Sequence, residues 1–147
     1  MVWLEYVVKI LFVGWVGYLS VWDIRRRRVP VWGVLAAGII AVVGCVNRLL
    51  TTGSLISIGL GILPGIFLII LATATKKMGL ADGIILCLMG LLDKYSACVI
   101  TFCIASFAIA IVSIILLATK KVKRNTQLPF IPFLAMGFIV QQILTFL

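Results

Sequence analysis

Long apolar stretches that contain few charges follow one another along this chain. There are five such long runs, and most of them, as helices, would cross roughly 30 Å of hydrocarbon. They cover residues 6 or 10 to 22, 29–47, 54–75, 95–119 and 129–147. A sixth run, from Gly83 to Leu92, is shorter and is predicted to be a short span or a deep half-helix. The pattern predicts an all-α, polytopic membrane protein, a six-helix transmembrane bundle with a short fourth span, in a single membrane-embedded domain over residues 1–147.

The basic residues favour six crossings, because Lys and Arg collect in the short cytoplasmic loops of membrane proteins. Six crossings put ten cations on one side: Arg25, Arg26, Arg27, Arg28, Lys76, Lys77, Lys120, Lys121, Lys123 and Arg124. Lys9, Arg48 and Lys94 then lie on or near the other side. If the short run did not cross, the cluster at 120–124 would face outward, against the rule. We therefore expect the ten cations to be cytoplasmic and both termini to lie outside.

The amino-acid composition is that of a membrane protein, which is surrounded by lipid. Of the 147 residues, 64% are hydrophobic and 12% are charged, and the mean hydropathy is +1.30. A water-soluble domain of this size cannot bury so much apolar surface in one core. The net charge of +9 follows from the predicted topology, and the basic clusters are short and lack interleaved aromatic residues. Nucleic acid is therefore not expected as a partner, whereas membrane lipid is.

The cysteines do not indicate a metal or disulfide framework. Cys45, Cys87, Cys98 and Cys103 all lie inside apolar runs, without a Cys-x-x-Cys pair, and the chain has no histidine. Such cysteines are usually small apolar side chains in helix packing. No metal and no cofactor are expected. In the run at 54–75, Gly61 and Gly65 are predicted to let a neighbouring helix approach closely, and Pro64 to kink the helix.

Two aspartates carry the strongest indication of chemistry. Asp23 and Asp82 lie where apolar runs end on the predicted cytoplasmic side, and the only other acids are Glu5 and Asp93. A carboxylate near hydrocarbon is costly, so such a residue is a functional candidate. Asp93, next to Lys94, is interpreted as half of an interfacial ion pair at the other face, and neither it nor Glu5 is expected to be catalytic.

If the two aspartates meet, like-charge repulsion favours a single proton shared between them. One carboxylate can then activate water while the other protonates the carbonyl oxygen or the leaving amine. Each aspartate also has a structural interpretation. Asp23 can act as a counter-ion to the arginine run, and Asp82 as a helix N-cap. Gly79 and Gly83, on either side of Asp82, are expected to allow a tight turn and close approach of a substrate strand.

Three patches resemble the prepilin leader peptidases, the membrane aspartic proteases of type IV pilus and related secretion systems. Asp23-Ile24-Arg25, running into Val29-Pro30, is similar to the family's Asp-x-Arg segment before Ile-Pro-Asn. Gly79-Leu80-Ala81-Asp82 resembles its Gly-x-Gly-Asp motif, and residues 129–137 resemble its Pro-Phe-Gly-Pro-Phe stretch. The resemblance implies that Asp23 and Asp82 are catalytic. It also implies supporting positions at Arg25, Pro30, Gly79, Gly83, Pro129, Phe130, Pro132 and Phe133.

The resemblance further implies cleavage of the short basic leader of a prepilin or pseudopilin, at the cytoplasmic face of a bacterial inner membrane. The longer members of the family carry a cytoplasmic loop with Cys-x-x-Cys pairs linked to N-methylation. This chain has no such loop and resembles the short forms that serve Flp/Tad-type pili, so methyltransferase activity is not expected. The departures from the motifs are Val31, Ala81, Ile84 and Ile131.

Two other interpretations remain at this point. The first is a catalytically inactive scaffold for pilus assembly, which Ala81 in place of the motif's second glycine keeps open. The second is a small proton-coupled transporter, which predicts carboxylates near the middle of the bilayer. The sequence leaves the oligomeric state open.

Overall fold

The computed structural model describes residues 2–76, 79–120 and 128–147, and these residues form six α-helices and no strand. Four of the predicted cytoplasmic cations, Lys77, Lys121, Lys123 and Arg124, lie outside the described residues. The helices are α1 (Val2–Arg26), α2 (Val31–Thr52), α3 (Leu55–Thr75), α4 (Leu80–Leu92), α5 (Tyr95–Ala118) and α6 (Ile131–Phe146). The predicted all-helical membrane bundle is confirmed.

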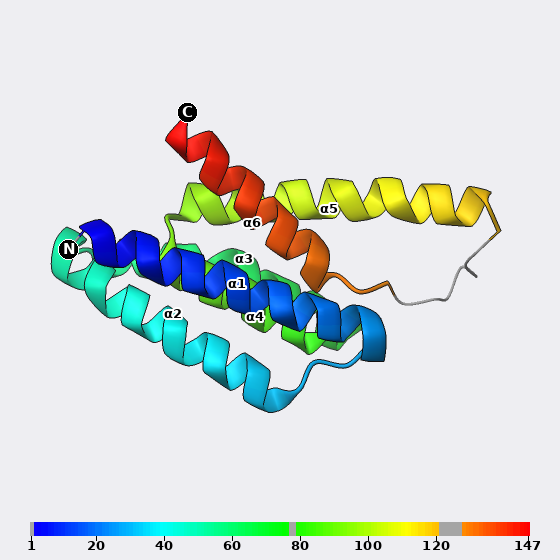
Figure 1. Cartoon of the computed structure of the whole chain (residues 1–147), viewed down its shortest axis with the longest axis horizontal. Coiled ribbons are helices and arrows are strands. Elements are labelled where there is room, and N and C mark those ends of the chain that lie inside the picture. The colour runs from blue at the N-terminus through cyan, green and yellow to red at the C-terminus, as the bar shows by residue number, and fades with distance from the viewer. Residues whose placement is uncertain (1, 77–78, 121–127) are drawn as a thin grey trace.

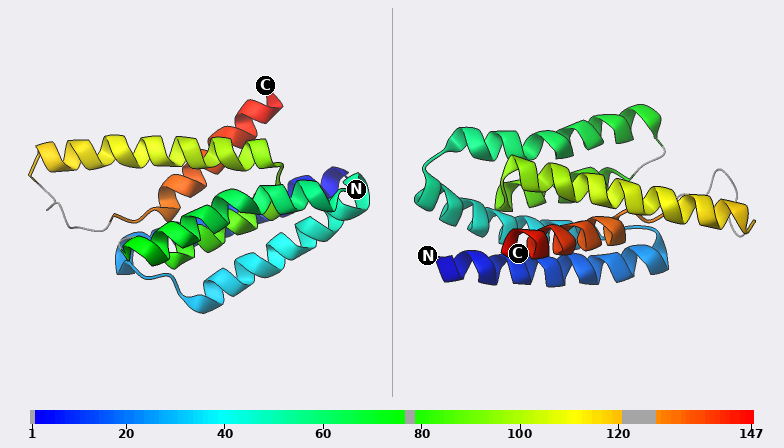
Figure 2. Two further views of the ribbon diagram at one scale, coloured as in Figure 1. Left: turned by 180° about the vertical axis from the view of Figure 1, so that it is seen from behind. Right: turned by 90° about the horizontal axis from the view of Figure 1, so that it is seen from above.

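Successive helices run in opposite directions, so the chain has two distinct ends (Figure 1). The C-terminus of α1 and the N-termini of α4 and α6 lie at one end, which we call the aspartate end because Asp23 and Asp82 are there. Both chain termini lie at the other, called the opposite end (Figure 1). The views in Figure 2 show α1 to α4 side by side, with α5 diverging from them and α6 crossing obliquely. Which end faces the cytoplasm stays a prediction.

Helix length agrees with the predicted short fourth span. The helices α1, α2, α3 and α5 are each long and apolar enough to cross a membrane. By contrast, α4 has 13 residues, which at 1.5 Å per residue is only about 20 Å of helix. It is also well covered, because α3 packs along it and α2 contacts it as well. Large apolar side chains such as Trp3, Ile56 and Phe107 are exposed on the outside, where lipid would cover them.

Glycines let α3 and α4 pack with their backbones almost in contact. A Cβ on Gly61 would lie 2.3 Å from the carbonyl oxygen of Gly90, and a Cβ on Gly65 would lie 2.4 Å from the backbone nitrogen of Cys87. The predicted close approach at Gly61 and Gly65 is confirmed. Pro64 lies within α3, which continues on both sides of it, and the kink there stays a prediction. This contact fixes the position of the short helix that begins beside Asp82.

A buried arginine at the opposite end holds the other end of α4. The Arg48 guanidinium, from α2, donates to the carbonyl oxygens of Gly90, at 3.3 Å, and of Asp93. It also donates to the Ser57 hydroxyl at 2.6 Å. The last carbonyls of a helix have no partner within the helix, and a cation there is electrostatically favourable. Arg48 therefore joins α2, α3 and the C-terminus of α4.

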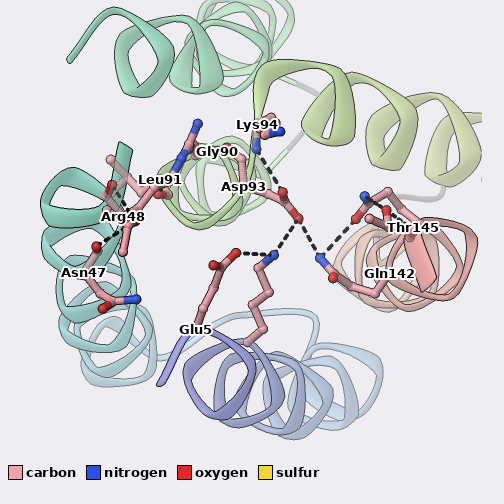
Figure 3. Close-up of polar contacts among 12 residues, drawn as sticks. Glu5, Asn47, Arg48, Gly90, Leu91, Asp93, Lys94, Gln142 and Thr145 are labelled. Atoms are coloured by element: carbon pink, nitrogen blue, oxygen red, sulfur yellow. Dashed lines mark hydrogen bonds and ion pairs between the residues drawn. The ribbon is translucent and has the colours of Figure 1, made fainter. Parts of the chain in front are cut away.

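The prediction that Asp93 pairs with Lys94 is wrong, because the cation that pairs with Asp93 is Lys9. The ammonium of Lys9 lies 3.4 Å from Asp93 and 3.0 Å from Glu5, and Figure 3 shows those two carboxylates on the same side of the bundle end. Lys94 instead donates its backbone N–H to Asp93, at 2.9 Å. The physical reason is that the first part of α1 lies beside the C-terminus of α4. Lys9 is therefore better placed than the side chain of Lys94 to reach the Asp93 carboxylate.

Candidate active site

The last turn of α1 carries Asp23 at the aspartate end. Its side chain is nearly buried, with 7% of the residue exposed, although the residues that follow it are exposed. The helix ends at Arg26, and Arg27 takes a left-handed conformation with φ 51°. Pro30 then forms the N-cap of α2.

The first turn of α4 carries Asp82, which is 8% exposed. The N-cap of α4 is Gly79, with Asp82 three residues later, so the interpretation of Asp82 as the N-cap is wrong. The Asp82 carboxylate instead accepts a hydrogen bond from the backbone N–H of Gly79. An acidic residue at the third helical position commonly reaches back in this way. The side chain is therefore held over the start of its own helix.

The two carboxylates come together although they are far apart in sequence. Asp23 is one of the charges that act on the Asp82 carboxylate, and both residues lie at the aspartate end. In the described residues the ion pairs are those of Lys9 with Glu5 and Asp93. Asp23 thus has no counter-ion among the described arginines, which contradicts its interpretation as their partner. Arg26 instead stacks over the Trp22 ring at 4.8 Å.

The start of α6 supplies a partner for Asp23 that sequence reasoning missed. The backbone N–H of Ile131 interacts favourably with the Asp23 carboxylate. Ile131 is the first residue of α6, after the N-cap Phe130. Pro132 has no N–H, and the N–H of Phe133 already donates to Phe130 at 3.0 Å. Among the first three residues of α6, only Ile131 therefore has a backbone N–H that remains for the aspartate. A proline just inside a helix start was the available signal.

This contact gives the third sequence patch a position in the site. Phe130 and Ile131 are buried, whereas Pro129, Pro132 and Phe133 are partly buried. Phe130 also contacts the ring of Phe102 in α5, edge to face, with centroids 6.5 Å apart. The patch therefore anchors the N-terminus of α6 between α5 and Asp23. The positive end of a helix dipole favours a carboxylate at that place.

The structure corrects the roles expected for the two glycines. Gly83 lies within α4, and a Cβ there would meet Ile69 of α3 at 2.5 Å. It thus serves close helix packing and leaves no room for a substrate strand. Gly79 has φ −73°, which any residue can adopt, so the tight turn does not require glycine. Its constraint is local: a Cβ would lie 3.2 Å from Oδ2 of Asp82.

Ala81 is accommodated without difficulty. It is the second residue of the regular helix α4, a conformation in which alanine is the most favourable residue. Its Cβ therefore imposes no backbone strain next to Asp82. Arg25 is exposed, and its role in shaping the site stays a prediction. In the part of the chain that the structure describes, no group of three or more metal-ligating side chains comes together.

Replacing Gly79 with alanine should lower catalytic activity more than stability. The added Cβ forces the Asp82 carboxylate to move by a few tenths of an ångström. We expect a loss of roughly three- to tenfold, a fraction of the about 100-fold that a 1 Å misplacement can cost. The measurement is the cleavage rate of purified variants, together with their thermal unfolding midpoints.

The matched control for this change is Gly79→Ser. Serine caps helices well but adds the same Cβ as alanine. If displacement of Asp82 is the cause, Gly79→Ser will be as slow as Gly79→Ala. Full activity in the serine variant would show that lost capping alone was responsible.

Comparison with known proteins bears on this site. A family model described as the type IV leader peptidase family matches residues 10–114. The matched region contains Asp23, Asp82 and the glycines around Asp82, and it ends before the start of α6. No curated protein and no solved structure matches the chain.

Proposed function

The chain belongs to the type IV leader peptidase family, and we propose that it is an aspartic endopeptidase with Asp23 and Asp82 as its catalytic residues. In this proposal it cleaves the short basic leader from a prepilin or pseudopilin. The observation that carries the proposal is the convergence of two nearly buried carboxylates, each with one backbone N–H partner, at one end of a membrane bundle.

The chemistry is hydrolysis by a carboxylate pair that holds one proton. The ionised carboxylate accepts a proton from water as the water oxygen bonds to the scissile carbonyl carbon. The protonated carboxyl donates its proton to the carbonyl oxygen. When this tetrahedral species collapses, the C–N bond breaks and the amine leaves with the proton that was taken from water. One hydroxyl of the new acid returns its proton to the second carboxylate, so the pair again holds one proton. No metal, serine or histidine takes part, and the backbone donors at Gly79 and Ile131 help hold the two carboxyls in position.

The basic residues support a cytoplasmic location for this site. Arg25 and Arg26 are in the last turn of α1, and the described basic residues that follow α1, α3 and α5 are Arg27, Arg28, Lys76 and Lys120. These helix ends lie at the aspartate end of the bundle (Figure 1), where the positive-inside rule places the cytoplasm. Because a basic leader would be repelled by these residues, they suit binding to anionic lipid headgroups better.

The two alternatives fit less well. A proton-coupled transporter would need its carboxylates near the middle of the bilayer, whereas Asp23 and Asp82 lie in the last turn and the first turn of their helices. An inactive scaffold was suggested by Ala81, which adopts an ordinary helical conformation. The absence of a loop with Cys-x-x-Cys pairs favours a peptidase without N-methylation activity.

The proposal is tested by incubating the purified full-length protein with a prepilin in detergent micelles. We expect a shortened product whose mass and new N-terminus place the cut after a glycine at the end of the leader, with no added methyl group. A prepilin in which that glycine is replaced should not be cut. Purified, folded protein that leaves several prepilins intact would favour the inactive scaffold instead.

A further inference from the structure

A polar cavity lies at the opposite end of the bundle, away from the two aspartates. Its volume is about 300 Å³, at the lower limit for pockets that hold small ligands. Its walls come from the start of α1, the junction of α4 and α5, the start of α5 and the end of α6. Figure 3 shows the charged side chains that meet there. The proposed peptidase reaction uses none of them.

The cavity wall carries two carboxylates and two ammonium groups, and only part of their hydrogen-bonding capacity is taken up by other groups of the protein. The Asp93 carboxylate is fully engaged, by the Lys94 N–H on Oδ1 and by Lys9 and Gln142 on Oδ2. Lys9 is 12% exposed and lies between Asp93 and Glu5. Glu5 is 44% exposed and has Lys9 as its ion-pair partner, which leaves acceptor capacity on its carboxylate.

The side chain of Lys94 is exposed and lines the same cavity. Among the residues that the structure describes, its ammonium has no ion-pair partner. An available anion and an available cation therefore border one pocket. This arrangement is complementary to a ligand that carries both signs and no net charge. A purely anionic ligand would meet Glu5, and a purely cationic one would meet Lys94.

The cavity lies at a depth that spans the boundary between the headgroup layer and the hydrocarbon. Glu5 and Lys9 are three and seven residues from the start of α1, or roughly 5 and 10 Å at 1.5 Å per residue. The polar layer on each side of the hydrocarbon is about 5–8 Å thick, so Glu5 is at headgroup depth and Lys9 is at its inner boundary. Below the charged residues the wall becomes apolar at Ala97 and Ile100 of α5. Nearby, Ile143 and Leu144 of α6 are exposed, so apolar chains could continue along the outside.

We propose that this cavity binds the headgroup of a phosphatidylethanolamine molecule in the leaflet opposite the aspartates. The primary ammonium of the lipid donates hydrogen bonds to Glu5, its phosphate pairs with Lys94, and its acyl chains lie along α5 and α6. A choline headgroup carries the same charges but has no N–H to donate. A glycerol headgroup leaves only the phosphate, which Glu5 would repel.

The test measures bound lipid directly and does not depend on peptidase activity. The purified full-length protein in detergent is mixed with equimolar phosphatidylethanolamine, phosphatidylcholine and phosphatidylglycerol of the same acyl chains, and bound lipid is identified by native mass spectrometry. We expect phosphatidylethanolamine to be retained in preference to phosphatidylcholine, whereas phosphatidylglycerol held by the basic residues at the aspartate end should not respond to changes in this cavity. Glu5→Gln and Lys94→Gln should each weaken retention roughly tenfold, the effect of losing one hydrogen bond to a charged group.

The matched control is Lys76→Gln, which removes an exposed lysine at the aspartate end and should leave the retention of phosphatidylethanolamine unchanged, whatever it does to phosphatidylglycerol. Because Glu5 and Lys94 are substantially exposed, their variants should fold, and unfolding midpoints check this. Should either variant fail to fold, the comparison of the three lipids still decides. Equal retention of ethanolamine and choline lipids would overturn the proposal. So would retention of phosphatidylethanolamine that neither Glu5→Gln nor Lys94→Gln lowers. Displacement by soluble phosphoethanolamine at similar concentration would overturn the assignment to a lipid.

Discussion

Asp23→Asn and Asp82→Asn should each abolish leader cleavage while the protein remains folded in the membrane. Asparagine has nearly the same shape as aspartate but can neither take a proton from water nor donate one as an acid. Loss of a general acid or base costs on the order of 10²–10⁴-fold in rate. The measurement is prepilin processing during co-expression, together with the amount of each variant in the membrane fraction.

The double variant sharpens this test. Catalytic groups that act as a unit give losses that do not add, so Asp23→Asn with Asp82→Asn should be no slower than either single change. The control is Lys76→Gln, which removes an exposed charge at the same end of the bundle and should leave processing intact. Retained cleavage in either single asparagine variant would remove that residue from the catalytic role.

Gly61→Val should cause the largest loss of stability. The first added carbon would lie 2.3 Å from the carbonyl oxygen of Gly90, which is backbone and cannot rotate away. Overpacking of this kind typically costs about 1–3 kcal/mol, and more where the backbone must shift. Since α3 and α4 would be forced apart, Asp82 would move with α4 and cleavage should fall as well. Thermal unfolding in detergent micelles measures the first effect.

The matched control is Gly59→Val in the same helix. Gly59 has open space around its Cβ position, so this variant pays the same helix-propensity difference without the clash. It should unfold close to the wild-type temperature and cleave prepilin normally. Similar destabilisation in both variants would mean that valine in α3 is harmful in itself and that the contact with Gly90 is unimportant.

The helices and their order could be predicted from the sequence because hydrocarbon leaves the backbone little choice. Without water, each N–H and C=O must be satisfied within the segment, so an apolar run of sufficient length becomes a helix. Counting helices then puts Asp23 and Asp82 at the same end, since alternate helices run in opposite directions. The spacing of Gly61 and Gly65 likewise predicted a close helix contact, which α4 provides.

Helix packing decided the rest. Three interactions join residues far apart in the chain: that of the Ile131 N–H with Asp23, the α3 contact of Gly83 and the pairing of Lys9 with Asp93. A single sequence reports the apolar pattern of each helix but not which faces meet, because that depends on the fit of side chains from several helices at once. Thus the amino-acid order determined the elements and the end of the bundle at which Asp23 and Asp82 lie. Only the tertiary structure decided which of these residues became neighbours.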